Sequence, residues 1–107
     1  MTMTPIGRRV EPTYSVLRDL LGSDATVIAS VLDGYGAVTL TFEYLSLPVA
    51  WGGAVTYSVR LTGPVEHRMV PGRYELVHGD ISLVLSLYPV AEDVRHVHYE
   101  AYLGEPI

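Results

Sequence analysis

The chain of 107 residues contains no cysteine and no lysine. Without cysteine, a disulfide framework, a thiolate metal site and a cysteine nucleophile are all excluded. Its seven basic side chains are arginines, and twelve acidic residues give a net charge of −5. A mildly acidic chain without a basic stripe is a poor candidate for binding nucleic acid, because that affinity depends largely on neutralising phosphates. We therefore expect no nucleic-acid partner and no thiol chemistry.

Long apolar runs are also missing from the sequence. No stretch approaches the roughly 18 consecutive apolar residues of a membrane span, so we expect no membrane partner. The arginines near the start follow the few apolar residues there, and no apolar segment comes after them. The sequence therefore predicts no secretory signal peptide. We expect the protein in the cytoplasm or in an assembled virion or fibre particle.

The first segment of the chain is predicted to be an extended arm. Pro5, Gly7 and Pro12 disfavour any regular element in residues 1–12. We expect this arm to lie against its own domain or against a neighbouring chain, where it is a candidate for forming a homo-oligomer. The remaining residues, 13–107, are predicted to form a single β domain.

One short helix and six strands are predicted after the arm. The helix covers residues 14–21, with Thr13 as its N-cap and Gly22 just beyond its end. Its predicted apolar face consists of Val16, Leu17, Leu20 and Leu21. From residue 25 onward the apolar period changes to two. Strands are predicted over residues 25–32, 37–47, 55–62, 73–78, 81–88 and 96–103.

Several local features of these strands are expected as well. In the strand over 37–47, the inward side chains are predicted to be Val38, Leu40, Phe42 and Tyr44, followed by a phase slip to Leu45 and Leu47. Such a slip indicates a bulge or bend. Residues 33–36, 48–53 and 89–94 are predicted as loops, and Gly79-Asp80 as a two-residue hairpin turn.

These elements predict an all-β fold, a small six-stranded antiparallel barrel or sandwich with one short N-terminal helix. Short loops between consecutive strands favour antiparallel neighbours. Of the barrel and the sandwich, we favour the barrel, because the single helix can cover one of its open ends.

Candidates for chemistry are few. His96 and His98 are two residues apart, so a strand projects both to one face together with Glu100. Imidazole and carboxylate are the ligands that zinc uses when cysteine is absent. A spacing of two is a weak signal, and a solvated strand face explains these residues more simply. We predict no catalytic residue, no cofactor and no metal site.

The candidate partner-binding residues are Arg8, Arg9, Trp51 and Tyr102. The two arginines either contact an acidic partner or are simply solvated. Trp51 lies beside two glycines, and it is either an exposed interface anchor or a cap that folds back on the core.

The order of turns and strand ends in the second half of the chain resembles that of a known family. A strand ends in Gly-Pro (57–64), a Pro-Gly-Arg-Tyr strand entry is followed by a histidine (70–78), a strand ends in Pro-Val (87–90), and a strand closes with Tyr-Glu-Ala (99–101). This pattern resembles a family of small uncharacterised bacterial β domains. Its members are often encoded near phage tail-collar-type fibre proteins, which the resemblance implies as partners. The resemblance implies no activity.

Together these observations predict a non-enzymatic structural or assembly protein that acts by protein–protein interaction, in a phage-tail-like or extracellular fibre system. The alternative is a β-barrel that binds a small ligand, such as a sugar, near Trp51 and the tyrosines.

Overall fold

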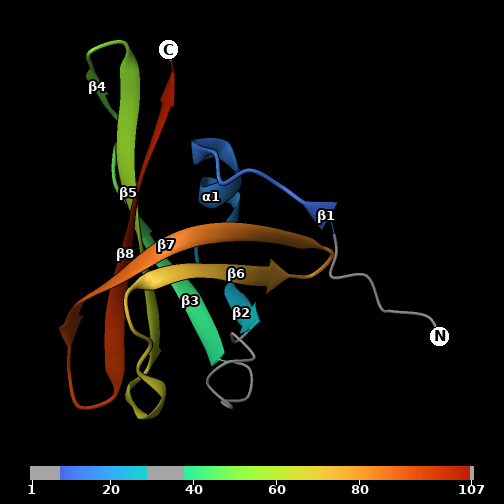
Figure 1. The fold of residues 1–107 in the computed structure, drawn as a ribbon, viewed down its shortest axis with the longest axis vertical. Coiled ribbons are helices and arrows are strands. Elements are labelled where there is room, and N and C mark those ends of the chain that lie inside the picture. Colours follow the sequence, from blue (N-terminus) through green and yellow to red (C-terminus); the bar gives the residue numbers. More distant parts are fainter. Residues whose placement is uncertain (1–7, 29–37, 107) are drawn as a thin grey trace.

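The structure is a computed structural model that describes residues 8–28 and 38–106. They form an all-β fold with one short helix (Figure 1). The helix, α1, spans Tyr14–Leu20. The strands are β1 (Arg8–Arg9), β2 (Asp24–Ile28), β3 (Val38–Leu45), β4 (Val49–Trp51), β5 (Ala54–Pro64), β6 (Gly72–His78), β7 (Ile81–Glu92) and β8 (His96–Pro106). A 3-10 turn, η2 (Val65–His67), follows β5 and precedes β6.

Six of the strands close into an antiparallel barrel. They pair in the order β7-β6-β2-β3-β5-β8, and β8 pairs back with β7 to complete the ring. The predicted barrel is therefore confirmed. Two strands lie outside the ring. Strand β1 pairs in parallel with β7, and β4 pairs with the start of β5, on the same edge of β5 as β3.

Side chains from all six strands fill the barrel. The hydrophobic ones that are at most 2% exposed are Ala25, Val27, Leu40, Phe42, Val59, Leu61, Leu76, Leu83, Leu85, Leu87, Val97, Tyr99 and Ala101. Most of them are the inward residues that the period of two predicts. Their burial provides the main stabilising free energy of the domain.

The helix packs on the barrel through one face. Leu17 and Leu20 belong to the buried core, and the ring of Tyr14 meets that of Tyr57 edge-on with centroids 5.1 Å apart. Leu21, which the sequence places on the same face, is 38% exposed. That prediction is wrong, because the helix ends at Leu20 and the chain turns away there.

The start of the helix follows the prediction. The hydroxyl oxygen of Thr13 accepts a hydrogen bond from the Val16 N–H at 3.3 Å, which satisfies one of the free donors of the first turn. Gly22 adopts a φ of +83° just after the last turn, a conformation that glycine takes without strain. Among the described residues, α1 with its 7 residues is too short to span a membrane as a helix.

Strand β3 contains the predicted bulge, one residue earlier than expected. Phe42 pairs with β5 in one register and Tyr44 in the next, so Glu43 is the extra residue. The slip turns Tyr44 outward and Leu45 inward, which makes the prediction of a buried Tyr44 wrong. Leu47 is also exposed, because the strand has ended before it.

Two predicted loops are partly strand. Residues 48–53 include β4 and a tight turn at Gly52-Gly53, where both φ values are positive, as a two-residue hairpin requires. Residues 89–94 include the end of β7, which continues to Glu92 through a register shift after Pro89. A bulge tolerates a proline that donates no hydrogen bond. The Gly79-Asp80 turn is confirmed.

Some predictions lie partly outside the described residues. The strand expected over 25–32 is described as far as Ile28, and the loop at 33–36 is not described. Of the arm, residues 8–12 are described, and Arg8 and Arg9 form the two-residue strand β1.

The longest pair of strands continues beyond the barrel. The β5–β8 ladder runs from Ala54 opposite Pro106 to Pro64 opposite His96. In Figure 1, β4 and the adjoining ends of β5 and β8 project away from the barrel strands. We call this three-stranded extension the ribbon.

Candidate functional site

The outer face of the β5–β8 pair carries a row of large side chains across four strands. Tyr44 on β3 pairs with Arg60 on β5, Arg60 with Glu100 on β8, and Glu100 with Tyr88 on β7. Directly paired residues of antiparallel strands project to the same face of a sheet. The row therefore reads tyrosine, arginine, glutamate, tyrosine, with the two charges at its centre.

The same face continues onto the ribbon in three further rows. Ser58 pairs with Tyr102, Val49 lies in the row of Thr56 and Gly104, and Trp51 lies in the row of Ala54 and Pro106. We define the aromatic face as Tyr44, Val49, Trp51, Ser58, Arg60, Tyr88, Glu100 and Tyr102. Its aromatic side chains and Val49 are 46–78% exposed. This is a contiguous exposed surface of aromatic and apolar groups, the kind that marks binding sites on soluble proteins.

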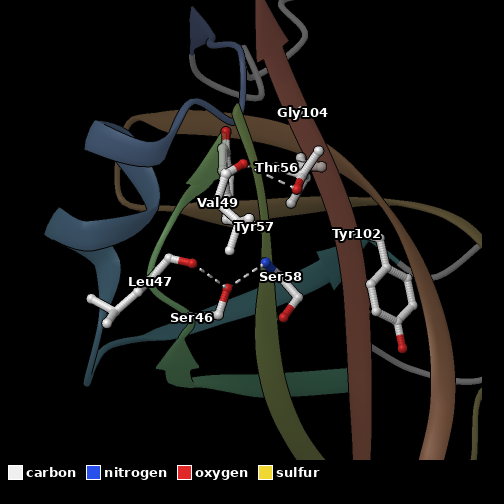
Figure 2. Close-up of a pocket in the computed structure, with 9 residues that line it drawn as sticks. Ser46, Leu47, Val49, Thr56, Tyr57, Ser58, Tyr102 and Gly104 are labelled. Carbon is white, nitrogen blue, oxygen red and sulfur yellow. Dashed lines mark hydrogen bonds between the residues drawn. The ribbon is translucent and has the colours of Figure 1, made fainter. Parts of the chain in front are cut away.

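Two open hollows lie on the aromatic face and meet at Ser58. One, of about 500 Å³, is lined by residues of the ribbon and of the segment after β3 (Figure 2). The other, of about 410 Å³, is lined by Glu43, Tyr44, Ser58, Arg60 and Glu100. Figure 2 shows Ser46 beside Ser58: its hydroxyl oxygen accepts from the Ser58 N–H at 2.8 Å. The small side chain of Ser58 thus forms a low point between larger neighbours.

The charges at the centre of the face neutralise each other. Nη2 of Arg60 donates to Oε2 of Glu100 at 2.5 Å. This hydrogen bond lowers the pKa of Glu100, so its carboxylate is ionised at neutral pH. Hydrogen bonding to Glu100 in turn raises the pKa of Tyr102, which keeps the phenol protonated. The ring of Tyr102 lies beside that of Tyr88, with centroids 6.3 Å apart.

The two candidate metal ligands lie at the other end of β8. His96 and His98 project outward, as predicted, and both approach Asp93: Nδ1 of His96 is 3.8 Å from Oδ1, and Nε2 of His98 is 3.4 Å from Oδ2. Nδ1 of His98 is 3.9 Å from Oε1 of Glu43. In the described ranges no group of three or more such side chains has the geometry to hold a metal ion. The arrangement therefore gives the metal alternative no support.

Asp93 has a structural task in this region. Its Oδ1 accepts hydrogen bonds from the N–H groups of Arg95 and His96, both at 2.8 Å, and so orders the turn between β7 and β8. These backbone bonds lower the pKa of Asp93 below its ordinary value of 3.8.

We expect this turn to contribute to acid sensitivity. A carboxyl whose folded-state pKa is lowered stabilises the fold above its unfolded pKa, and that stability is lost as the pH falls through the folded pKa. The fall in urea midpoint between pH 6 and pH 2 should therefore be smaller in Asp93→Asn than in the unchanged protein. Asp80→Asn, in the β6–β7 turn, is the control. Equal falls in the Asp93→Asn and unchanged proteins would contradict the assignment.

The structure brings together two of the four predicted partner-binding residues. Trp51 and Tyr102 lie on the aromatic face, and Trp51 is 78% exposed, so it does not cap the core. Arg8 and Arg9 lie in β1, far from β4 in Figure 1. Nη2 of Arg9 forms an ion pair with Oε2 of Glu75 at 3.1 Å.

The sequence-based search missed Tyr44, Arg60 and Tyr88 of the central row, and it considered Glu100 only beside the two histidines. These four residues come from four strands, and only strand register brings them together. The sequence does contain one signal for this row: the alternation of apolar and polar residues predicts that Arg60 and Glu100 point outward from their strands.

The chain was compared with protein-family models, with curated proteins and with solved structures, and no match was found. The resemblance to small bacterial β domains stays a prediction.

Proposed function

We propose that this protein is a non-enzymatic assembly protein that binds another protein through the aromatic face. The observation that carries this proposal is the exposure of a tryptophan, three tyrosines and an arginine on one face of one sheet. Tyrosine, tryptophan and arginine are the residue types that dominate binding energy at protein interfaces. They combine a large apolar body with a polar group that can find a partner.

Free strand edges support the same function. Among the described strands, β4 pairs with β5 alone, and β8 pairs with β5 alone beyond Ala101. Their outward N–H and C=O groups are open to a strand from another chain. Both edges border the aromatic face, so a partner bound there can use them.

The alternative function is a β-barrel that binds a small ligand near Trp51 and the tyrosines. The interior of the barrel does not favour it, because buried side chains from six strands occupy that space. The hollows of the aromatic face are open, whereas small-molecule sites usually enclose 70–90% of the ligand surface. A broad, shallow partner fits this geometry better than an enclosed small molecule.

We propose further that the assembly is a phage-tail-like or fibre system, and that the partner is a tail-collar-type fibre protein. It rests on the sequence resemblance alone.

Photo-crosslinking tests the binding surface directly. A photoreactive phenylalanine analogue is introduced in place of Tyr44 or Tyr102, and, as a control, in place of Val70, which is 68% exposed on a loop off this face. After irradiation in the source cells, adducts of defined mass are expected at positions 44 and 102 and not at position 70. Absence of adducts at both face positions, or the same adducts at position 70, would refute the proposed function.

A further inference from the structure

We propose that the partner bound at the aromatic face is a second copy of this chain, stacked face to face. The two copies are related by a two-fold axis that lies between the two stacked sheets, parallel to β5 and β8 and above the line where these strands pair. This inference rests on the proposed function and specifies its partner. Two sheets stacked in this way keep their strands nearly aligned, as sheets in sandwiches do. A two-fold contact requires a surface that complements itself.

The charges on this face meet that requirement. Rotation about the proposed axis places each β5 residue over the residue that β8 pairs with it, now on the second copy. Arg60 therefore lies over the second copy's Glu100, and Glu100 over the second copy's Arg60. At the ends of the row, Tyr44 and Tyr88 exchange places, so a ring faces a ring. The row is matched in charge and in chemistry.

Arg60 has hydrogen-bonding capacity for a second carboxylate. A guanidinium carries five N–H donors in a planar fork. In the part of the chain that the structure describes, Nη2 donates to Glu100 and Nε is buried without a partner, whereas the side chain as a whole is 40% exposed. A second carboxylate therefore approaches the exposed part of this side chain and not Nε. A second carboxylate from above completes an alternating square of two arginines and two glutamates.

The shape of the face is also self-complementary. Ser58 pairs with Tyr102, so the rotation places the large phenol of one copy over the small hydroxymethyl group of the other. The two hollows that meet at Ser58 provide the space that this ring needs. Each copy offers one protruding Tyr102 and one hollow, and both are filled at once.

Three exposed tyrosines lie in the stacked part of the face. Tyr44, Tyr88 and Tyr102 are 46–64% exposed, and an aromatic side chain buries roughly 150–250 Å² when fully covered. The rotation places Trp51 and Val49, on β4, beside the free edge of the second copy's β8 rather than over one of its strands.

The test is a charge exchange followed by sedimentation velocity. The unchanged protein is expected to sediment with the mass of two chains. In Arg60→Glu and in Glu100→Arg, two like-charged pairs face each other per dimer, so each variant alone should dissociate, with a dissociation constant raised about a hundredfold or more. An equimolar mixture of the two variants should recover a dimer, because opposite charges then face each other. The double variant Arg60→Glu with Glu100→Arg should also recover it.

A matched control separates this face from the N-terminal arm. Arg9→Glu breaks an exposed ion pair to Glu75 and should leave the dimer intact. Recovery in the mixture shows that the single variants are folded. A monomeric unchanged protein, a dimer that survives both single exchanges, or a dimer lost in Arg9→Glu instead would overturn the inference.

The result also separates this inference from the proposed function. A monomer that forms photo-adducts with a different protein at positions 44 and 102 refutes the second copy as partner and keeps the binding surface. A monomer without adducts refutes both.

Discussion

Replacing Phe42 with alanine is expected to destabilise the fold by about 3–5 kcal/mol, the usual result of removing a buried aromatic ring and leaving a cavity. Phe42 is fully buried. Its backbone also holds the α1–β2 link: its C=O accepts from the Gly22 N–H at 2.8 Å, and its N–H donates to the Ser23 C=O at 2.9 Å. Small domains have a total stability of roughly 5–15 kcal/mol, so a large part of the fold's stability depends on this ring. Urea unfolding followed by circular dichroism measures the loss.

The matched control is Tyr44→Ala, two positions along the same strand. A simple alternation places both rings inside, whereas the bulge at Glu43 turns Tyr44 out to 57% exposure. At a protein concentration low enough to limit association, the control should cost less than about 1 kcal/mol, as exposed substitutions usually do. Equal losses in Phe42→Ala and Tyr44→Ala would mean that β3 has no bulge.

Much of the barrel is predictable from the sequence, because its strands have one buried face. In β5, β7 and β8 the period of two separates inward leucine, valine and tyrosine from outward polar residues, and such a pattern determines which face packs inward. The helix is predictable for the same reason, with Thr13 and Gly22 marking its ends.

The two strand segments that the sequence assigns to loops have no buried face. Strand β4 has all three residues exposed, so its pattern carries no sign of a core. The Gly52-Gly53 pair is a hairpin signal that identifies it once the flanking residues are considered as strands. The end of β7 is exposed as well, and Pro89 favours a loop assignment there. In both places pairing to a neighbour, rather than burial, keeps the chain extended.

The aromatic face depends on information that one sequence does not display. Arg60 and Glu100 are 40 residues apart, and their pairing follows from the register of β5 with β8. The bulge at Glu43 adds Tyr44 to the same row, since without it this ring would enter the core. The single extra residue in β3 thus determines both which side chains fill the barrel and which ones lie on its outer surface. A sequence-based search finds Trp51 and Tyr102 individually, and the register shows that they share a surface with Arg60.

Gly63 is expected to be a position where even one methyl group is costly. The sequence suggests that Gly63 ends its strand, but β5 continues through it and Gly63 faces the core. An added Cβ would lie 2.5 Å from Cδ2 of Leu40 and 3.4 Å from Cε2 of Tyr99. Both neighbours are buried and have little space to retreat. Overpacking of this kind typically costs about 1–3 kcal/mol, so Gly63→Ala should lower the urea midpoint, and Gly63→Val should lower it further.

Gly104 is the matched control, a strand glycine on β8 whose added Cβ meets only ordinary contacts, with Val55 O at 3.6 Å and Thr56 Cγ2 at 3.7 Å. Alanine restricts the unfolded chain more than glycine does, so Gly104→Ala should be neutral or stabilising by up to about 1 kcal/mol. The two substitutions make the same chemical change in paired strands, so the difference between their effects on stability isolates the effect of space in the barrel. If Gly63→Ala proved as harmless as Gly104→Ala, Leu40 would have room to move, and the interior would be less tightly filled than its burial indicates.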